Sequence, residues 1–167
     1  TYYQDLFDII VENRGHVIGT TACLGGALPT QLMRWHDTRD DSLYEKIITW
    51  CEQMSWIFGE ENFYLELQPS ASREQSTANR LLLDMAKTHH YRYIITTDSH
   101  YLKKEDAAIH KAFLNSQDGD REVDSFYATT YLMGTEELES YLKYLTREQL
   151  EYAYQNILDT IEANSTV

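Results

Sequence analysis

The stretch Tyr93-Ile94-Ile95-Thr96-Thr97-Asp98-Ser99-His100 decides how this chain folds and where its chemistry lies. β-Branched Ile and Thr crowd a helix but suit a pleated strand, so residues 93–97 are predicted to form a buried strand. Alternation in an extended segment would point Asp98 and His100 to the same face. A carboxylate and an imidazole at the end of a strand are typical of a metal or acid–base site in an α/β enzyme. The alternative interpretation is a turn in which Asp98 caps the following helix.

Composition places the chain among ordinary globular domains. It has 167 residues, 43% of them hydrophobic, with only 7 Gly and 2 Pro, which is enough for one domain with a sizeable core. No run approaches the roughly 20 apolar residues of a membrane span, and no basic-then-apolar leader opens the sequence. Residue 1 is Thr and a helical pattern follows at once, which suggests a piece of a longer protein.

The net charge limits the expected binding partners, and the cysteine count indicates the expected compartment. The net charge of −13 repels phosphate backbones, so this chain is not expected to grip nucleic acid by itself, although it could hold divalent cations. Two cysteines are too few for a disulfide framework, and a reducing cytoplasm is therefore the expected compartment.

Hydrophobic periodicity predicts alternating helices and strands. Strands are expected at residues 16–21, 62–68 and 93–97. Helices are expected at residues 2–13, 42–58, 73–90, 103–115, 135–145 and 146–163. Strands separated by long helices pair in parallel, so the predicted fold class is α/β with parallel strands and intervening helices. Three such strands are too few for a closed barrel, which indicates part of a larger α/β barrel.

Cys23 is a second candidate site residue because it follows the predicted strand 16–21 and precedes Gly25-Gly26. Taken alone, a cysteine in such a position is more often a small buried hydrophobe than a ligand. Cys51 lies in the apolar stripe of helix 42–58 and is predicted to be a core residue.

The remaining acidic and histidine candidates are expected to be structural. Glu66 lies on the polar side of an alternating strand, where it could support a site at the barrel mouth, but we expect it instead to face solvent or an ion-pair partner. His36 is expected in a loop, and His89-His90 at a helix end. His110 lies two turns into the helix after Asp98 and His100; it is not expected to be a ligand, and support of the site's ligands is the alternative to a purely structural role.

Four blocks of sequence, in order, resemble one family. Residues 21–29 resemble Ser-Ala-Cys-Leu-Gly-Gly-Glu-x-Pro, and residues 63–68 match Phe-Tyr-Leu-Glu-Leu-Gln. Glu74-Gln75, Asn79 and Leu82 resemble the helix that follows, and residues 97–102 resemble Asn-Asp-Val-His-Tyr-Leu. The fourth block continues into Asp106-Ala107 and His110. The family is the polymerase and histidinol phosphatase (PHP) domain of the bacterial DNA polymerase III alpha subunit.

This resemblance implies the C-terminal part of a seven-stranded α/β barrel over residues 1–133, followed by a helical segment over residues 134–167. Cys23, Asp98 and His100 match ligand positions of the family's metal cluster. Such a ligand set suits the divalent metals Zn, Mn or Fe, and a thiolate favours Zn. Any catalytic role of Asp98 and His100 would act through the bound metal.

The resemblance also implies a function for a parent protein. That parent would carry out DNA-directed DNA synthesis, and its PHP domain would bind divalent metals and act as a 3′–5′ proofreading exonuclease. Its partners would be the remaining barrel strands, DNA held by the parent, and other replisome subunits. Two other functions stay open: a non-catalytic docking module, or a stand-alone metal phosphoesterase.

Two departures from the family limit this inference. The family's His-x-His motif has no counterpart in the chain, so the metal site is incomplete here and the chain by itself is expected to be inactive. Thr97 and Ser99 also differ from the family's usual residues, but neither change removes a ligand.

Overall fold

The computed structural model describes residues 2–118 and 127–164. In chain order the elements are α1 (Tyr2–Glu12), β1 (Gly19–Thr20), α2 (Ala27–Thr38), α3 (Asp41–Phe58), β2 (Phe63–Leu67), α4 (Arg73–His89), β3 (Arg92–Ile95), η1 (Lys104–Asp106), α5 (Ala107–Asp118), η2 (Tyr127–Thr129), α6 (Thr135–Tyr141) and α7 (Arg147–Asn164). Strands and helices alternate along the first half of the chain, and helices follow in the second.

The three strands form one parallel sheet in the order β1-β2-β3. Gly19 pairs with Phe63 in β2, and Tyr64 on the same strand pairs with Arg92 in β3. The predicted α/β class with parallel strands is therefore confirmed. The three described strands do not show whether the sheet is part of a closed barrel.

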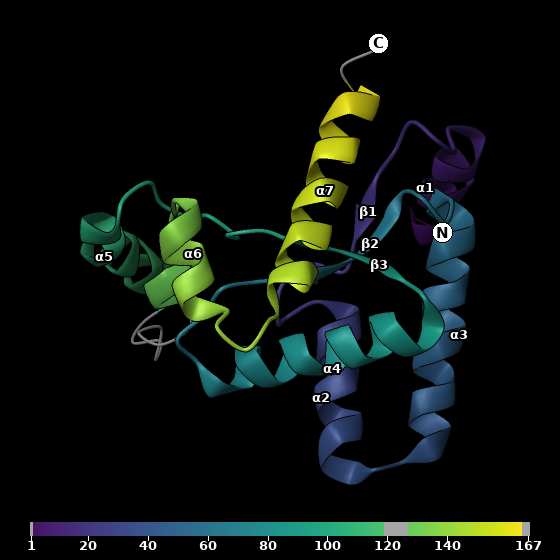
Figure 1. The fold of residues 1–167 in the computed structure, drawn as a ribbon, viewed down its shortest axis with the longest axis horizontal. Coiled ribbons are helices and arrows are strands. Elements are labelled where there is room, and N and C mark those ends of the chain that lie inside the picture. The colour runs from purple at the N-terminus through teal and green to yellow at the C-terminus, as the bar shows by residue number, and fades with distance from the viewer. Residues whose placement is uncertain (1, 119–126, 165–167) are drawn as a thin grey trace.

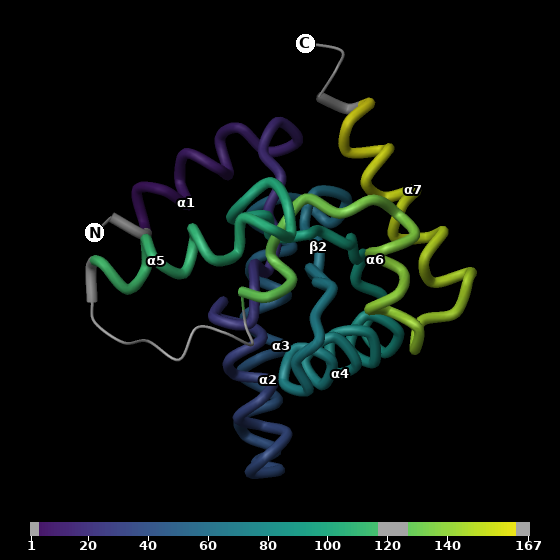
Figure 2. Tube along the Cα trace, turned by 90° about the vertical axis from the view of Figure 1, so that its left-hand side faces the viewer, coloured from purple at the N-terminus to yellow at the C-terminus, as the bar shows by residue number. Residues whose placement is uncertain are grey.

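Helices cover the sheet so thoroughly that all five residues of β2 are buried. Figure 1 shows α2 and α3 as a pair that α4 crosses, while α7 packs against β3 and crosses it. In Figure 2, α5 and α7 lie on opposite sides of the centrally placed β2. Residues from α6 and α7, including Leu138 and Ala153, belong to the same apolar core as the strands. The helical segment that follows residue 133 therefore packs on the sheet rather than apart from it.

The helix α2 was not predicted from the sequence. Pro29 suggests the end of a turn, yet it lies in the first turn of α2, where a backbone N–H has no intrahelical acceptor to lose. Its apolar residues Leu28 and Leu32 are buried against the core. The expectation that His36 lies in a loop is wrong for the same reason, because His36 is in the last turn of α2.

The strand β1 is also shorter than predicted, with two residues instead of six. A side chain at Gly19 would meet the ring of Phe58 at 2.6 Å, so glycine is required where α3 approaches this strand. Phe58 in turn stacks on Phe63 of β2, with ring centroids 6.2 Å apart. The close approach of α3 thus fixes where β1 can pair.

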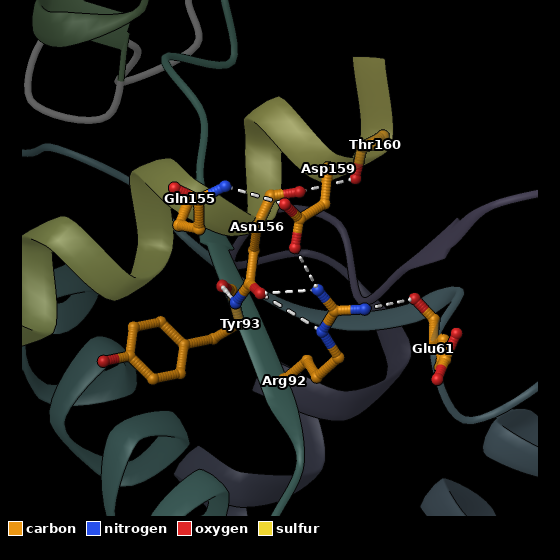
Figure 3. Close-up of polar contacts among 7 residues, drawn as sticks. All are labelled: Glu61, Arg92, Tyr93, Gln155, Asn156, Asp159 and Thr160. Carbon is orange, nitrogen blue, oxygen red and sulfur yellow. Dashed lines mark hydrogen bonds and ion pairs between the residues drawn. The ribbon is translucent and has the colours of Figure 1, made fainter. Parts of the chain in front are cut away.

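Polar contacts fasten α7 to β3 (Figure 3). Asn156 Oδ1 accepts hydrogen bonds from Arg92 Nε at 3.1 Å and Nη2 at 2.7 Å. Arg92 also pairs with Asp159 at 3.0 Å and donates to the carbonyl of Glu61 at 2.9 Å. The Nδ2 atom of Asn156 donates to the carbonyl of Tyr93 at 2.8 Å, which satisfies a backbone acceptor at the edge of the sheet. The buried Asn156 therefore joins helix and strand through both ends of its amide.

We predict that Asn156→Ala lowers the free energy of unfolding by about 1–3 kcal/mol, because it leaves buried partners on Arg92 and Tyr93 without their hydrogen bonds. Urea unfolding of the chain measures the change. The matched control is Gln155→Ala on the exposed side of the same turn, which should change stability by no more than about 0.5 kcal/mol. Equal losses from the two substitutions would contradict the proposed fastening.

Candidate metal centre

The carboxyl ends of the three strands share one edge of the sheet because the strands are parallel. Cys23 lies just past β1, Gln68 just past β2, and Asp98 just past β3. The predicted site residues therefore do lie along one edge. The edge continues to Tyr101, which forms a parallel bridge with Tyr131.

A tight turn sets the position of Cys23. Ala22 has a φ of 59°, in the left-handed region, and the N–H of Gly26 donates to the carbonyl of Cys23 at 2.7 Å. A side chain at Gly26 would come within 2.4 Å of the carbonyl of Thr21, so only glycine fits this closure. The thiol of Cys23 is partly buried beside the turn.

Asp98 also has left-handed backbone geometry, with a φ of 48°. The extended alternation expected for Asp98 and His100 is therefore wrong, because β3 ends at Ile95 and the chain turns at Asp98. The capping alternative is wrong as well, since the next helical element begins at Lys104 with Lys103 in the cap position. Asp is among the few non-glycine residues that adopt this conformation readily.

The Asp98 carboxylate carries an unsatisfied atom. Its Oδ2 is buried and has no hydrogen-bond partner among the residues that the structure describes. Burial raises the pKa of the Asp98 carboxyl above its usual value, the charge of His100 opposes this effect, and Glu66 reinforces it. A buried carboxylate oxygen without a donor is an acceptor that a cation could satisfy.

His100 is oriented by a backbone contact. Its Nδ1 lies 2.6 Å from the carbonyl of Asp98 and 3.8 Å from Oδ1 of the same residue. Since a carbonyl only accepts, Nδ1 must donate, and the neutral ring then has its lone pair on Nε2. Metal-ligating histidines in proteins commonly use this arrangement, in which one nitrogen donates to a carbonyl and the other binds the metal.

Two aromatic rings contact the His100 side chain, which otherwise remains exposed to solvent. His110 and Tyr127 contact it edge-on, with ring centroids 5.6 Å and 5.2 Å away, and contact each other at 5.0 Å. Burial lowers the pKa of His110, and His100 lowers it further. His110 thus lies where the sequence placed it, beside the candidate ligand.

Glu66 differs from its sequence prediction. It is only 9% exposed and forms no ion pair among the described residues, so the expectation of a solvent-facing or ion-paired carboxylate is wrong. Its Oε1 accepts hydrogen bonds from Thr96 Oγ1 at 2.5 Å and Gln68 Nε2 at 3.0 Å. The cause is the sheet order, because β2 is the middle strand and helices bury both of its faces. No pattern within residues 62–68 reveals this order.

Cys23 is not brought into one compact cluster with Asp98 and His100. Within residues 2–118 and 127–164, no three His, Cys, Asp or Glu side chains lie close enough together to hold a metal ion. The strand β2 separates β1 from β3, which places two inter-strand spacings, or roughly 10 Å, between the two strand ends. Asp98 and His100 are adjacent, and Cys23 occupies a different part of the same edge.

Comparison with known proteins gives the chain its relatives. It is 37% identical over 168 residues to "Probable DNA polymerase YorL" of Bacillus subtilis (strain 168), covering 95% of this chain. It has the same identity over the same length to "DNA-directed DNA polymerase" of Bacillus phage SPbeta. A third relative is "DNA polymerase III subunit alpha" of Aquifex aeolicus, at 35% identity over 118 residues and 70% of this chain.

The homologues of this chain are DNA polymerases. The chain spans only about 13% of the length of the first two and 10% of the third. No protein-family model matches it. The resemblance to DNA polymerase III alpha subunits is therefore confirmed at the level of the polymerase, while the PHP assignment stays a prediction. None of the helices within the two described ranges is long and apolar enough to cross a membrane.

The two cysteines should differ in reactivity. Cys51 is fully buried in α3, as predicted, and burial raises the pKa of its thiol to about 12. We predict that a thiol reagent such as DTNB labels Cys23 of the native chain while Cys51 reacts only on unfolding, because the thiolate is the reactive species. The absorbance of the released thionitrobenzoate, measured without urea and in denaturing urea, gives the number of thiols that react in each state. The variant Cys23→Ser should abolish the native reaction, and a native reaction that survives it would contradict the assignment.

Proposed function

We propose that this chain forms the C-terminal part of the PHP domain of a replicative DNA polymerase, and that its strand edge supplies part of a divalent-metal site. The observation that carries the proposal is the pairing of Asp98 and His100. Asp98 presents a buried carboxylate oxygen that has no donor among the described residues, and His100 has its Nδ1 held by a carbonyl. Polymerase homologues supply the biological setting.

The donor set fits a transition metal. Asp98 would offer Oδ2 and His100 would offer Nε2, while Cys23 would contribute a thiolate elsewhere on the edge. A metal bound here would lower the pKa of a water molecule and stabilise charge on a phosphodiester. The chain's own residues orient the imidazole: Nδ1 of His100 donates to the carbonyl of Asp98, and the rings of His110 and Tyr127 contact the imidazole edge-on. The remaining ligands would come from barrel strands outside residues 1–167.

In this proposal the parent protein synthesises DNA, and the PHP domain acts as a 3′–5′ exonuclease on mispaired primer ends. DNA is held by other parts of the parent, because the net charge of −13 on this chain disfavours phosphate binding. Further replisome subunits are the expected partners, and the cytoplasm the expected compartment.

A second function, a non-catalytic docking module, is favoured by one observation. The described residues assemble no group of three metal-ligating side chains, so the chain alone does not complete a site. A stand-alone phosphoesterase has less support, because the relatives are polymerases about eight times longer than the matched region.

The test uses the full polymerase polypeptide that carries this chain. We predict that His100→Ala removes bound Zn or Mn, measured by plasma mass spectrometry, and lowers 3′–5′ degradation of a labelled mismatched primer at least tenfold. Synthesis on a matched primer should stay within about twofold, because the substituted residue lies outside the synthetic site. The substitution removes the imidazole, and with it one bond to the metal and the hydrogen bond that orients this ligand.

The matched control is His36→Ala, which removes an imidazole from the last turn of α2. It should leave metal content and both activities unchanged. Unchanged metal content and nuclease activity in His100→Ala would refute the metal site and favour the docking module.

A further inference from the structure

Glu66 lies where the ends of the three strands meet. It is the fourth residue of β2, and its backbone N–H donates to Thr21 Oγ1 at 2.9 Å. Its side-chain Oε1 accepts from Thr96 Oγ1 at 2.5 Å. Thr21 precedes the turn that holds Cys23, and Thr96 precedes Asp98 by two residues. One residue on the middle strand therefore contacts the exits of both outer strands.

A second buried network holds the exit of β2 itself. Asn79, fully buried in α4, donates to the carbonyl of Gln68 at 2.7 Å and accepts from its N–H at 3.3 Å. The side chain of Gln68 then donates to Glu66 at 3.0 Å. Asn79 also donates to the hydroxyl of Tyr144, which precedes α7. Glu66 is thus fixed from several directions and has little freedom to turn away from the edge.

The charge of Glu66 is not balanced by a cationic side chain. Within the described parts of the chain, no Lys, Arg or His lies in ion-pair distance of its carboxylate. The neighbouring carboxylate of Asp98 has a single imidazole, that of His100, at 3.8 Å. A buried carboxylate without a positive partner destabilises a fold unless something offsets it. The charge of Glu66 therefore adds to that of Asp98 and makes this edge of the sheet more negative.

We infer that Glu66 is a positioning residue for the cation held at Asp98 and His100. Its hydrogen bonds fix the exits of β1 and β3, and its negative charge raises the affinity of the edge for a divalent cation. Glu66 acts through Thr96 rather than as a ligand, because Oε1 already accepts two hydrogen bonds and the side chain is buried. The inference rests on the proposed metal site and adds a residue to it.

Glu66→Gln separates charge from packing. Thr96 and Gln68 both donate to Oε1, so an amide oxygen can keep both hydrogen bonds while the charge is lost. Cobalt(II) binding to the full polymerase polypeptide is followed by the visible absorption of the bound cobalt. The part of this absorption that is lost in His100→Ala is assigned to the proposed site. We expect Glu66→Gln to lower the cobalt affinity of that site by about 10- to 100-fold, as is typical when a residue that supports a metal ligand is changed. The thermal unfolding temperature, measured without cobalt, should stay unchanged or rise.

Glu61→Gln is the matched control, because it removes the same charge from an exposed residue just before the same strand. It should leave cobalt affinity unchanged. If Glu66→Gln binds cobalt as tightly as Glu61→Gln while His100→Ala has lost it, the role of Glu66 is overturned and the metal site stands. If His100→Ala binds cobalt like the unmodified protein, the metal site itself is overturned, and this inference with it.

Two variants of Thr96 keep the inference testable if Glu66→Gln does not fold. Thr96→Val removes the hydroxyl that donates to Glu66, whereas Thr96→Ser retains it. Weaker cobalt binding and an altered cobalt spectrum in Thr96→Val, with normal binding in Thr96→Ser, would support a positioning role. Normal binding and an unchanged spectrum in both variants would overturn it.

Discussion

Parallel pairing of β2 with a neighbour on each side is the constraint on which the rest of the structure depends. It aligns the carboxyl ends of all three strands along one edge, which brings Cys23, Gln68 and Asp98 to the same border of the sheet. It also makes β2 a fully buried strand, so its polar residues must find partners inside the protein. The polar edge and the buried Glu66 are two consequences of one sheet order.

One edge of this sheet is covered by a helix. The outer edge of β3 is covered by α7, whose Asn156 satisfies the carbonyl of Tyr93 while Arg92 binds the helix through Asn156 and Asp159. Such covering prevents a sheet edge from pairing with another chain. The helical segment after residue 133 is therefore part of the support of β3, the strand that leads to Asp98 and His100. Stability of the helix and geometry of the candidate site are linked through this strand.

Electrostatics distinguish the candidate site from an ordinary strand-to-loop connection. An ordinary connection would pair its carboxylates with helix N-termini or with lysine and arginine. Here Asp98 has an oxygen without a donor, and Glu66 has hydrogen bonds but no cationic side chain among the described residues. His100 has one nitrogen held by a carbonyl, and the rings of His110 and Tyr127 contact its imidazole edge-on. The proposed metal site rests on these features, in a chain whose homologues are DNA polymerases.

The sequence by itself determined the order of the three strands and of the α-helices other than α2. It also determined the parallel α/β class, the buried position of Cys51 and the strand ends that carry Cys23, Asp98 and His100. These follow from local periodicity and residue type, which act over a few residues of chain. Only the tertiary structure decided that Glu66 is buried, that Asp98 turns the chain with a positive φ, and that Pro29 lies in the first turn of a helix. Each of these depends on a neighbour distant in sequence or on a backbone angle that side-chain type permits but does not require. Burial of Glu66, for example, follows from pairing between strands separated by whole helices, and no pattern within residues 62–68 encodes which strand lies on either side.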